Sequence, residues 1–474
     1  MSFNNYYFVL LFLPLTILGY FILNAFNKEK IANLYLLIVS LFFYGFNNVK
    51  ALVIFIGYIL INYFLYTCRH KKHLVVVSIV VNILFLVFYK YINVFENIFV
   101  LFKSYNIVMP LGISFYTFSQ IAFIIDTYKE DYECKFVEYA LFMSYFPKII
   151  QGPISNGINF INQLREKDRR KINYDNLYNG FLLFIYGLIK KVLLADTLAS
   201  AANWGYENIE CLNTINTLIV ILSYTLQIYL DFSGYSDMAI GISKMLNIDL
   251  PRNFGTPYGS KNISEFWKKW HMSLTNFLTK YIYIPLGGSR NGTIRTYINT
   301  IIVFAVSGIW HGNQINYLIW GLINGFALIF YKKYKDKINK LNPIVNWIIT
   351  FCFINLSWII FRSNSISVLC QLIKSLFDYQ GLTINSDLIA CFNFTELDFI
   401  PESLEFIRLF KTSRFYVILY LIIGFVISLK DGQFEDAIKD GRLKGINKCI
   451  LVVILFIYCL LSFTNNSIFV YEGF

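Results

Sequence analysis

Two of the four histidines in this 474-residue chain stand where an imidazole could do chemistry. His271 follows Trp270, His311 follows Trp310, and each histidine lies beside apolar sequence. Imidazole is the side chain whose ordinary pKa lets it take and return a proton near neutral pH. A single histidine in apolar surroundings is more often a satisfied core residue. Two such histidines with a polar segment between them fit a catalytic role and a core role equally well.

The other two histidines, His70 and His73, stand in a basic loop with Arg69, Lys71 and Lys72. The HxxH spacing can bind a metal, but the surrounding cations oppose a second positive charge. None of the eight cysteines forms a CxxC pair, so zinc and redox motifs have no support. We therefore expect a solvated cytoplasmic loop, free thiols and no metal site.

The segment 226–292 is unusually polar and irregular for so apolar a chain. Its polar groups are Asp231, Ser233, Tyr235, Ser236, Asp237, Glu265 and His271. We expect its helices to be interrupted at Gly234, Gly241, Pro251, Gly255, Pro257, Gly259, Pro285, Gly287 and Gly288. Irregular backbone at membrane depth survives only where protein or a water-filled cavity satisfies it, and ionisable groups there are functional candidates. Any one of these residues could serve packing alone, but together they predict a functional cavity.

The absence of several common motifs limits the reactions that this chain could catalyse. The chain has no GxSxG, HExxH, GxxxxGK[ST] or GxGxxG motif. A helical membrane enzyme with histidine but without these motifs points to direct acyl or group transfer, in which histidine deprotonates a hydroxyl. A transporter or flippase, in which buried aspartates and broken helices are equally natural, is the alternative. A scaffold without catalysis is a second alternative.

The composition places the chain in a membrane. Apolar residues make up 57% and charged residues 15% of it, and mean hydropathy is +0.54. A soluble domain carries about 45–50% apolar and about 25% charged residues. The net charge of +12 fits short cytoplasmic loops better than nucleic-acid binding. The abundance of Asn, Ile, Lys and Tyr suggests an AT-rich bacterial genome.

The hydropathy pattern predicts an all-α polytopic membrane protein with one domain over residues 1–474. The first apolar run is followed by Lys28 and Lys30 and has no basic region before it, so we expect no cleaved signal peptide and an amino terminus outside the cell. Apolar segments lie at about 7–25, 33–47, 51–67, 74–92, 94–102, 107–125, 137–150, 178–199, 213–230, 298–310, 315–332, 345–361, 415–429 and 449–463. The sequence motifs gather at about 110–330.

Several motifs together resemble the membrane-bound O-acyltransferase family, in its bacterial alginate-O-acetylation-type branch. They are Pro110–Phe118, Phe146–Ile154, Gln227–Gly241, Asn253–Tyr258, Glu265–Leu274, Tyr281–Arg290 and Ser307–Gly312. The chain departs from the branch at Thr279–Lys280, where Arg-Asp is usual, at Asn324, where His is usual, and at Gln151, where Ala is usual. These departures leave both motif histidines in place.

The resemblance implies a bundle with short, tilted and re-entrant helices around a thin catalytic core. It implies that His311 and His271 are catalytic and that Asp231, Tyr235, Glu265, Trp270 and Trp310 line or support the substrate site. It also implies an acetyl donor, presented as acetyl-CoA from the cytoplasm, and no bound cofactor. The implied acceptor is a polysaccharide, reached with an extracytoplasmic SGNH-type acetyltransferase or a polysaccharide-synthesis complex. The implied location is the bacterial cytoplasmic (inner) membrane, among lipids and without nucleic acid.

Overall fold

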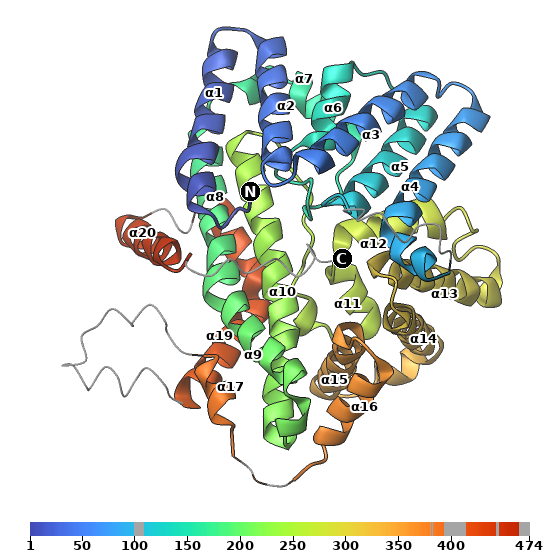
Figure 1. The fold of residues 1–474 in the computed structure, drawn as a ribbon, viewed down its shortest axis with the longest axis vertical. Helices are drawn as coiled ribbons and strands as arrows, with labels where there is room; N and C mark the ends of the chain where they lie inside the picture. The colour runs from blue at the N-terminus through green and yellow to red at the C-terminus, as the bar shows by residue number, and fades with distance from the viewer. Residues whose placement is uncertain (99–108, 380, 382, 393–413, 442–444, 464–474) are drawn as a thin grey trace. The chain divides into compact units, whose positions relative to one another are not determined.

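The computed structural model describes residues 1–98, 109–379, 381, 383–392, 414–441 and 445–463. Within these residues the regular secondary structure is entirely helical (Figure 1). The described residues divide into two compact units, one from within 1–185 and 235–252 and the other from within 186–234 and 253–463. The prediction of a single domain is not tested by this division and stays a prediction.

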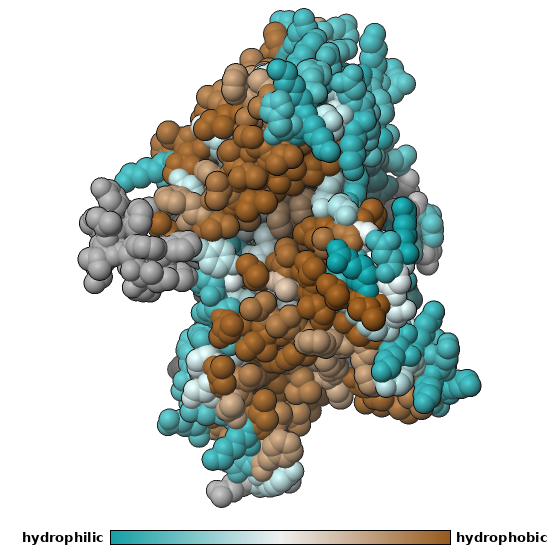
Figure 2. All heavy atoms as spheres, turned by 90° about the vertical axis from the view of Figure 1, so that its right-hand side faces the viewer, coloured by the Kyte–Doolittle hydropathy of each residue, from teal (hydrophilic) through white to brown (hydrophobic). Residues whose placement is uncertain are grey.

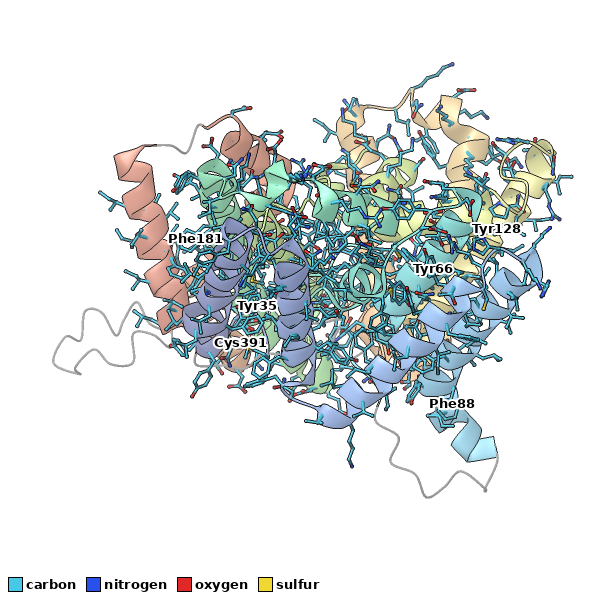
Figure 3. All side chains as sticks on the ribbon, turned by 90° about the horizontal axis from the view of Figure 1, so that it is seen from above. Tyr35, Tyr66, Phe88, Tyr128, Phe181 and Cys391 are labelled. Atoms are coloured by element: carbon cyan, nitrogen blue, oxygen red, sulfur yellow. The ribbon has the colours of Figure 1, made fainter. Side chains whose placement is uncertain are left out.

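The first unit holds the amino-terminal helices. Its elements are η1 (Phe8–Phe12), α1 (Leu13–Ala25), α2 (Glu29–Gly45), α3 (Val49–Thr67), α4 (Lys72–Ile98), α5 (Ile113–Lys129), α6 (Phe136–Ser144), α7 (Gly157–Arg165), η3 (Asp168–Arg170) and most of α8 (Tyr174–Leu188). Tyr66, labelled in Figure 3, lies on α3. Its hydroxyl accepts a hydrogen bond from the Cys134 amide at 2.8 Å and donates one to the Tyr132 carbonyl at 3.0 Å. These two bonds fasten α3 to the chain that leads into α6.

The second unit holds the later helices. Its elements are η4 (Ile189–Ala195), α9 (Asp196–Glu207), η5 (Ile209–Cys211), most of α10 (Thr214–Met245), η6 (Pro257–Gly259), α11 (Ile263–Lys269), α12 (Met272–Leu278), η7 (Thr279–Tyr283), α13 (Gly292–His311), α14 (Ile315–Ile338), α15 (Pro343–Arg362), α16 (Ile366–Ser375), α17 (Ser386–Ala390), α19 (Arg414–Lys439) and α20 (Ile446–Leu461). Many helices of both units correspond to single apolar segments, but α4 runs through the predicted segments 74–92 and 94–102 without a break up to Ile98, and α10 continues beyond the segment 213–230 to Met245. Residues 99–102 and 107–108 of two predicted segments lie outside the described residues.

Eight of the described helices are long and apolar enough to cross a membrane. They expose large apolar side chains, as Leu15, Leu18 and Ile22 do on α1. Figure 2 shows hydrophobic residues in broad continuous areas on the face that it draws. An apolar surface of this kind needs lipid around it, because soluble proteins rarely expose large apolar patches. The chain is therefore a multi-pass membrane protein, as its composition predicts.

The interruption that we expected within 226–245 does not occur. α10 continues through Asp231, Gly234 and Gly241 to Met245 as one long helix (Figure 1). A Cβ atom on Gly241 would lie 2.6 Å from the Gly180 carbonyl oxygen, so this glycine permits close helix packing instead of breaking the helix. The irregular backbone begins after Met245 and returns around His271.

α13 and α14 lie side by side as a close helical pair (Figure 1). A Cβ atom on Gly308 of α13 would lie 2.3 Å from the Tyr317 carbonyl oxygen, and one on Gly321 of α14 would lie 2.3 Å from the Phe304 carbonyl oxygen. Only glycine fits at such distances, and the two backbones approach where both residues are small. This contact sets the carboxyl end of α13, with His311, against α14.

Candidate active site

A cavity of about 270 Å³ lies within the second unit. Its walls come from α11, α12, η7, α13 and α14, and they are mainly apolar and aromatic. The lining residues are Ser264, Trp267, Lys268, Trp270, His271, Leu274, Thr275, Leu278, Thr279, Tyr283, Thr300, Val303, Phe304, Ser307, His311, Trp320, Leu328 and Lys332. Both histidines singled out from the sequence therefore line one cavity, although 40 positions separate them.

His311 ends α13 and is almost fully buried, with 4% of its surface exposed. Its imidazole lies nearly perpendicular to two large rings. The centroid of Trp320 is 5.1 Å away at 89°, and that of Phe361 is 5.1 Å away at 82°. Edge-to-face packing on two sides restricts the orientation of the imidazole. Rigid aromatic neighbours therefore fix the orientation of His311 in the cavity wall.

His271 lies between α11 and α12 in the left-handed region, with φ 43°. Few residues other than glycine adopt this conformation, and it is held where the surrounding structure determines it. The loop before α11 holds His271 in this conformation through two hydrogen bonds to Asn253. The Met272 amide donates to the Asn253 carbonyl at 2.8 Å, and the Ser273 hydroxyl lies 2.6 Å from Asn253 Oδ1. The φ value and these two bonds direct the imidazole toward the Phe232 ring, 4.7 Å away.

Burial lowers the pKa of His271 to about 3. The imidazole is therefore neutral at pH 7, because its charged form would lose its hydration there. A neutral imidazole can donate one hydrogen bond and accept another. His271 thus offers the cavity an uncharged polar group rather than a cation.

The two tryptophans predicted for the substrate site have different places. Trp270 lines the cavity and packs on Phe266 and Trp358 at centroid distances of 5.5 and 4.8 Å. Trp310 does not line the cavity, but its ring is 4.8 Å from His311 and 6.4 Å from His271. The Trp310 ring therefore lies near both imidazoles.

The other three predicted site residues do not line the cavity. Asp231 is buried on α10 and pairs with Lys191 at 2.7 Å. Glu265 lies in the first turn of α11, accepts from the Lys261 amide at 2.9 Å and pairs with Lys269 at 2.7 Å. These two carboxylates have partners that give them roles in holding helices. Their part in substrate binding stays a prediction.

Tyr235 belongs to the first unit, where it stacks on Phe3 at 4.8 Å. It lies one residue beyond the point on α10 at which the second unit ends. Its predicted contact with substrate stays a prediction.

Comparison with known proteins identifies the family. The model of the membrane-bound O-acyltransferase family matches residues 130–373, which include both histidines and every lining residue of the cavity. The chain belongs to the membrane-bound O-acyltransferase family. It is thus an acyltransferase, and the resemblance carried by the sequence motifs is confirmed.

Relatives within this family extend over most of the chain. The peptidoglycan O-acetyltransferase of Helicobacter pylori is 34% identical, over 100% of this chain and 97% of the relative. The probable alginate O-acetylase of Pseudomonas aeruginosa is 34% identical, over 80% of this chain and 75% of the relative. The teichoic acid D-alanyltransferase of Bacillus subtilis is 26% identical over 55% of this chain. The two acetylating relatives are therefore more similar to this chain than the D-alanyltransferase is.

Several lining residues of this acyltransferase were not singled out from the sequence. Trp267 lies within the Glu265–Leu274 motif and Ser307 begins the Ser307–Gly312 motif, so both motifs carried the signal. Trp320 begins the run Trp320–Gly325, which contains Asn324, one of the positions at which the chain departs from the branch. Two exposed lysines, Lys268 and Lys332, also line the cavity and give its wall positive charge.

Proposed function

We propose that this protein transfers an acetyl group from a thioester donor to a hydroxyl group, for O-acetylation of an extracellular or cell-wall polysaccharide, with His311 as general base. The observation that carries the proposal is that the buried His271 and His311 both line one mainly apolar cavity. Membership of an O-acyltransferase family supplies the reaction class.

The proposed reaction is a direct transfer. The imidazole of His311 takes the proton from the acceptor hydroxyl as its oxygen attacks the acyl carbonyl carbon. The carbon–sulfur bond of the donor then breaks, and the proton passes to the leaving thiolate. His271 assists by donating or accepting a hydrogen bond as a neutral group. General-base catalysis of this kind contributes about 10²–10⁴-fold to the rate.

The proposed donor is acetyl-CoA. Its thioester matches the chemistry, and its phosphates suit the positive charge that Lys268 and Lys332 give the cavity wall. The same lysines also fit the positive charge typical of cytoplasmic loops. Whether the two lysines bind the phosphates or belong to a cytoplasmic loop, their positive charge supports a donor that comes from the cytoplasm.

The proposed acceptor follows the names of the relatives. The Helicobacter pylori relative is a peptidoglycan O-acetyltransferase and the Pseudomonas aeruginosa relative a probable alginate O-acetylase. Both names describe acetyl groups placed on glycan hydroxyls. We propose that this chain works in the bacterial cytoplasmic membrane with its amino terminus outside, beside an extracytoplasmic SGNH-type acetyltransferase or a polysaccharide-synthesis complex.

The test is the amount of ester-linked acetate on the cell-surface glycans. We would compare the wild type, a deletion strain, a His311→Ala strain and a His73→Ala strain, each variant with confirmed membrane expression. His73 is exposed in the basic loop, so its variant controls for loss of a histidine as such. Loss of acetate in the deletion and His311→Ala strains alone supports the proposal. Full acetylation in the His311→Ala strain with loss in the deletion strain would refute the catalytic role and favour a transporter or scaffold.

A further inference from the structure

Trp320 carries a buried hydrogen-bond donor that the described part of the chain does not satisfy. Its side chain is 2% exposed, and no acceptor among the described residues lies within reach of its indole Nε1. The indole N–H can only donate, and buried indoles usually find a partner. A buried donor without an acceptor is costly, so its persistence calls for a physical explanation.

The position of Trp320 supplies that explanation. The residue lines the cavity, and its ring contacts His311 edge-to-face at 5.1 Å and 89°. The Trp320 ring therefore forms part of the cavity wall beside His311. We infer that the Trp320 indole N–H donates a hydrogen bond to the carbonyl oxygen of the acyl group during transfer.

Acyl transfer needs such a donor, and this inference rests on the proposed function. The carbonyl oxygen gains negative charge as the hydroxyl oxygen attacks the carbonyl carbon. A fixed donor stabilises that charge without reorganisation, and loss of one such donor costs about 10²–10³-fold in other acyl-transferring enzymes. The indole adds no charge of its own to the apolar wall.

The surroundings of Trp320 fix it in place. The side chain of Asn324 donates to the Trp320 carbonyl at 2.9 Å and to the Ser357 hydroxyl at 2.9 Å. The Trp358 ring stacks on the Trp320 indole at 6.0 Å and 19°. A donor held by a helix, a buried amide and a ring stack is preorganised for a carbonyl that appears only when substrate is bound.

Trp358 provides a matched control for this role. Its indole Nε1 is also buried, without an acceptor among the described residues, and its side chain is 1% exposed. It packs directly on Trp320, but it does not line the cavity. Removing the Trp358 N–H therefore tests the structural effect of losing a buried indole at this place, without touching the substrate.

The experiment measures the initial rate at which labelled acetate enters alkali-labile esters of the surface glycan, in cells that carry the full-length chain. The variants are Trp320→Phe, Trp358→Phe and Trp267→Phe, compared with wild type at equal membrane abundance and with the deletion strain. In a further variant, benzothienylalanine replaces Trp320, so that sulfur stands in place of the N–H while ring size is kept. We expect Trp320→Phe and the sulfur analogue to lower the rate at least about tenfold, and Trp358→Phe to change it less than about threefold.

Each other outcome would overturn the inference. Equal losses of the acetylation rate in Trp320→Phe and Trp358→Phe would show that the effect comes from altered packing. A wild-type rate with the sulfur analogue would show that the N–H is not used. Loss in Trp267→Phe alone would place the donor on Trp267, which also lines the cavity. Failure of the proposed function is seen separately, because the deletion strain would then acetylate as fast as wild type.

Discussion

Replacing Lys191 with methionine should destabilise the second unit through a buried charge network. The Lys191 ammonium is 1% exposed and lies 2.7 Å from Asp231 Oδ1 and 2.9 Å from Asp196 Oδ1. Burial alone would lower the pKa of Lys191, but the two carboxylates outweigh burial and raise it. The Lys191 side chain is therefore a cation. Methionine has a similar length but no charge, so the substitution would leave Asp231 and Asp196 without this positive partner.

The expected size follows from burial. Breaking a buried pair by removing one partner costs about 3–5 kcal/mol, because the remaining charge is no longer compensated. At about 2 °C per kcal/mol for a large domain, the melting temperature should fall by about 6–10 °C. Because Phe232, next to Asp231, contacts the His271 ring at 4.7 Å, acetylation should fall as well.

The assay is thermal unfolding of the purified full-length protein in detergent. Lys171→Met is the matched control, since Lys171 pairs with Asp168 at 3.0 Å but both side chains are exposed. Exposed pairs contribute little, so we expect no measurable change for it. Adding Asp231→Asn to Lys191→Met should recover at least half of the lost stability, because it removes the more deeply buried carboxylate. Equal melting temperatures for Lys191→Met and wild type would refute the reasoning.

Three further predictions concern packing, charge and pH. Gly241→Ala should destabilise the fold by about 1–3 kcal/mol in thermal unfolding, because its Cβ atom would meet backbone. Gly57→Ala should be neutral or stabilising, because no atom of the described residues outside its own helix lies within 4 Å of the new Cβ atom. Lys268→Ala with Lys332→Ala should raise the KM for acetyl-CoA at low salt and leave kcat unchanged, with a smaller effect at high salt. His271→Gln should reduce the loss of stability between pH 7.5 and 5.5 by about 1.4 kcal/mol. The reason is that the unfolded histidine takes a proton below its ordinary pKa of 6.5 while the folded one, with a pKa of about 3, does not.

The outcomes that would contradict these three predictions are distinct. Equal stability of Gly241→Ala and Gly57→Ala would mean that the α10 contact is not close. A KM unchanged by loss of both lysines would remove the charge argument for the donor. Parallel stability curves for wild type and His271→Gln from pH 7.5 to 5.5 would mean that His271 is not buried as a neutral group.

Much of the fold could be predicted because lipid imposes a simple rule. Apolar segments such as 315–332 and 345–361 correspond to α14 and α15 within a few residues, since a helix in lipid must satisfy its own backbone. The error at Gly241 has a physical origin. A glycine that breaks a helix and a glycine that lets two helices approach look alike in one sequence, and only the neighbour at 2.6 Å decides between them.

The parts of the candidate site that could be predicted are those marked by residues close together in the sequence. His271 and His311 stood out as polar groups in apolar sequence, and the structure places both on one cavity. The pair of Glu265 with Lys269 also follows from spacing, because residues four apart share a helix face. The pair of Asp231 with Lys191 joins residues 40 positions apart, so no local pattern could reveal it.

The tryptophans around the cavity form a continuous chain of rings. Neighbouring centroids are 5.7 Å apart from Trp267 to Trp320, 6.0 Å from Trp320 to Trp358 and 4.8 Å from Trp358 to Trp270. Chromophores this close share electronic excitation, so four of the seven tryptophans absorb and emit as a coupled set. The site therefore contains its own optical probe: an acyl group that shifts one indole will alter the near-ultraviolet dichroism and fluorescence of all four.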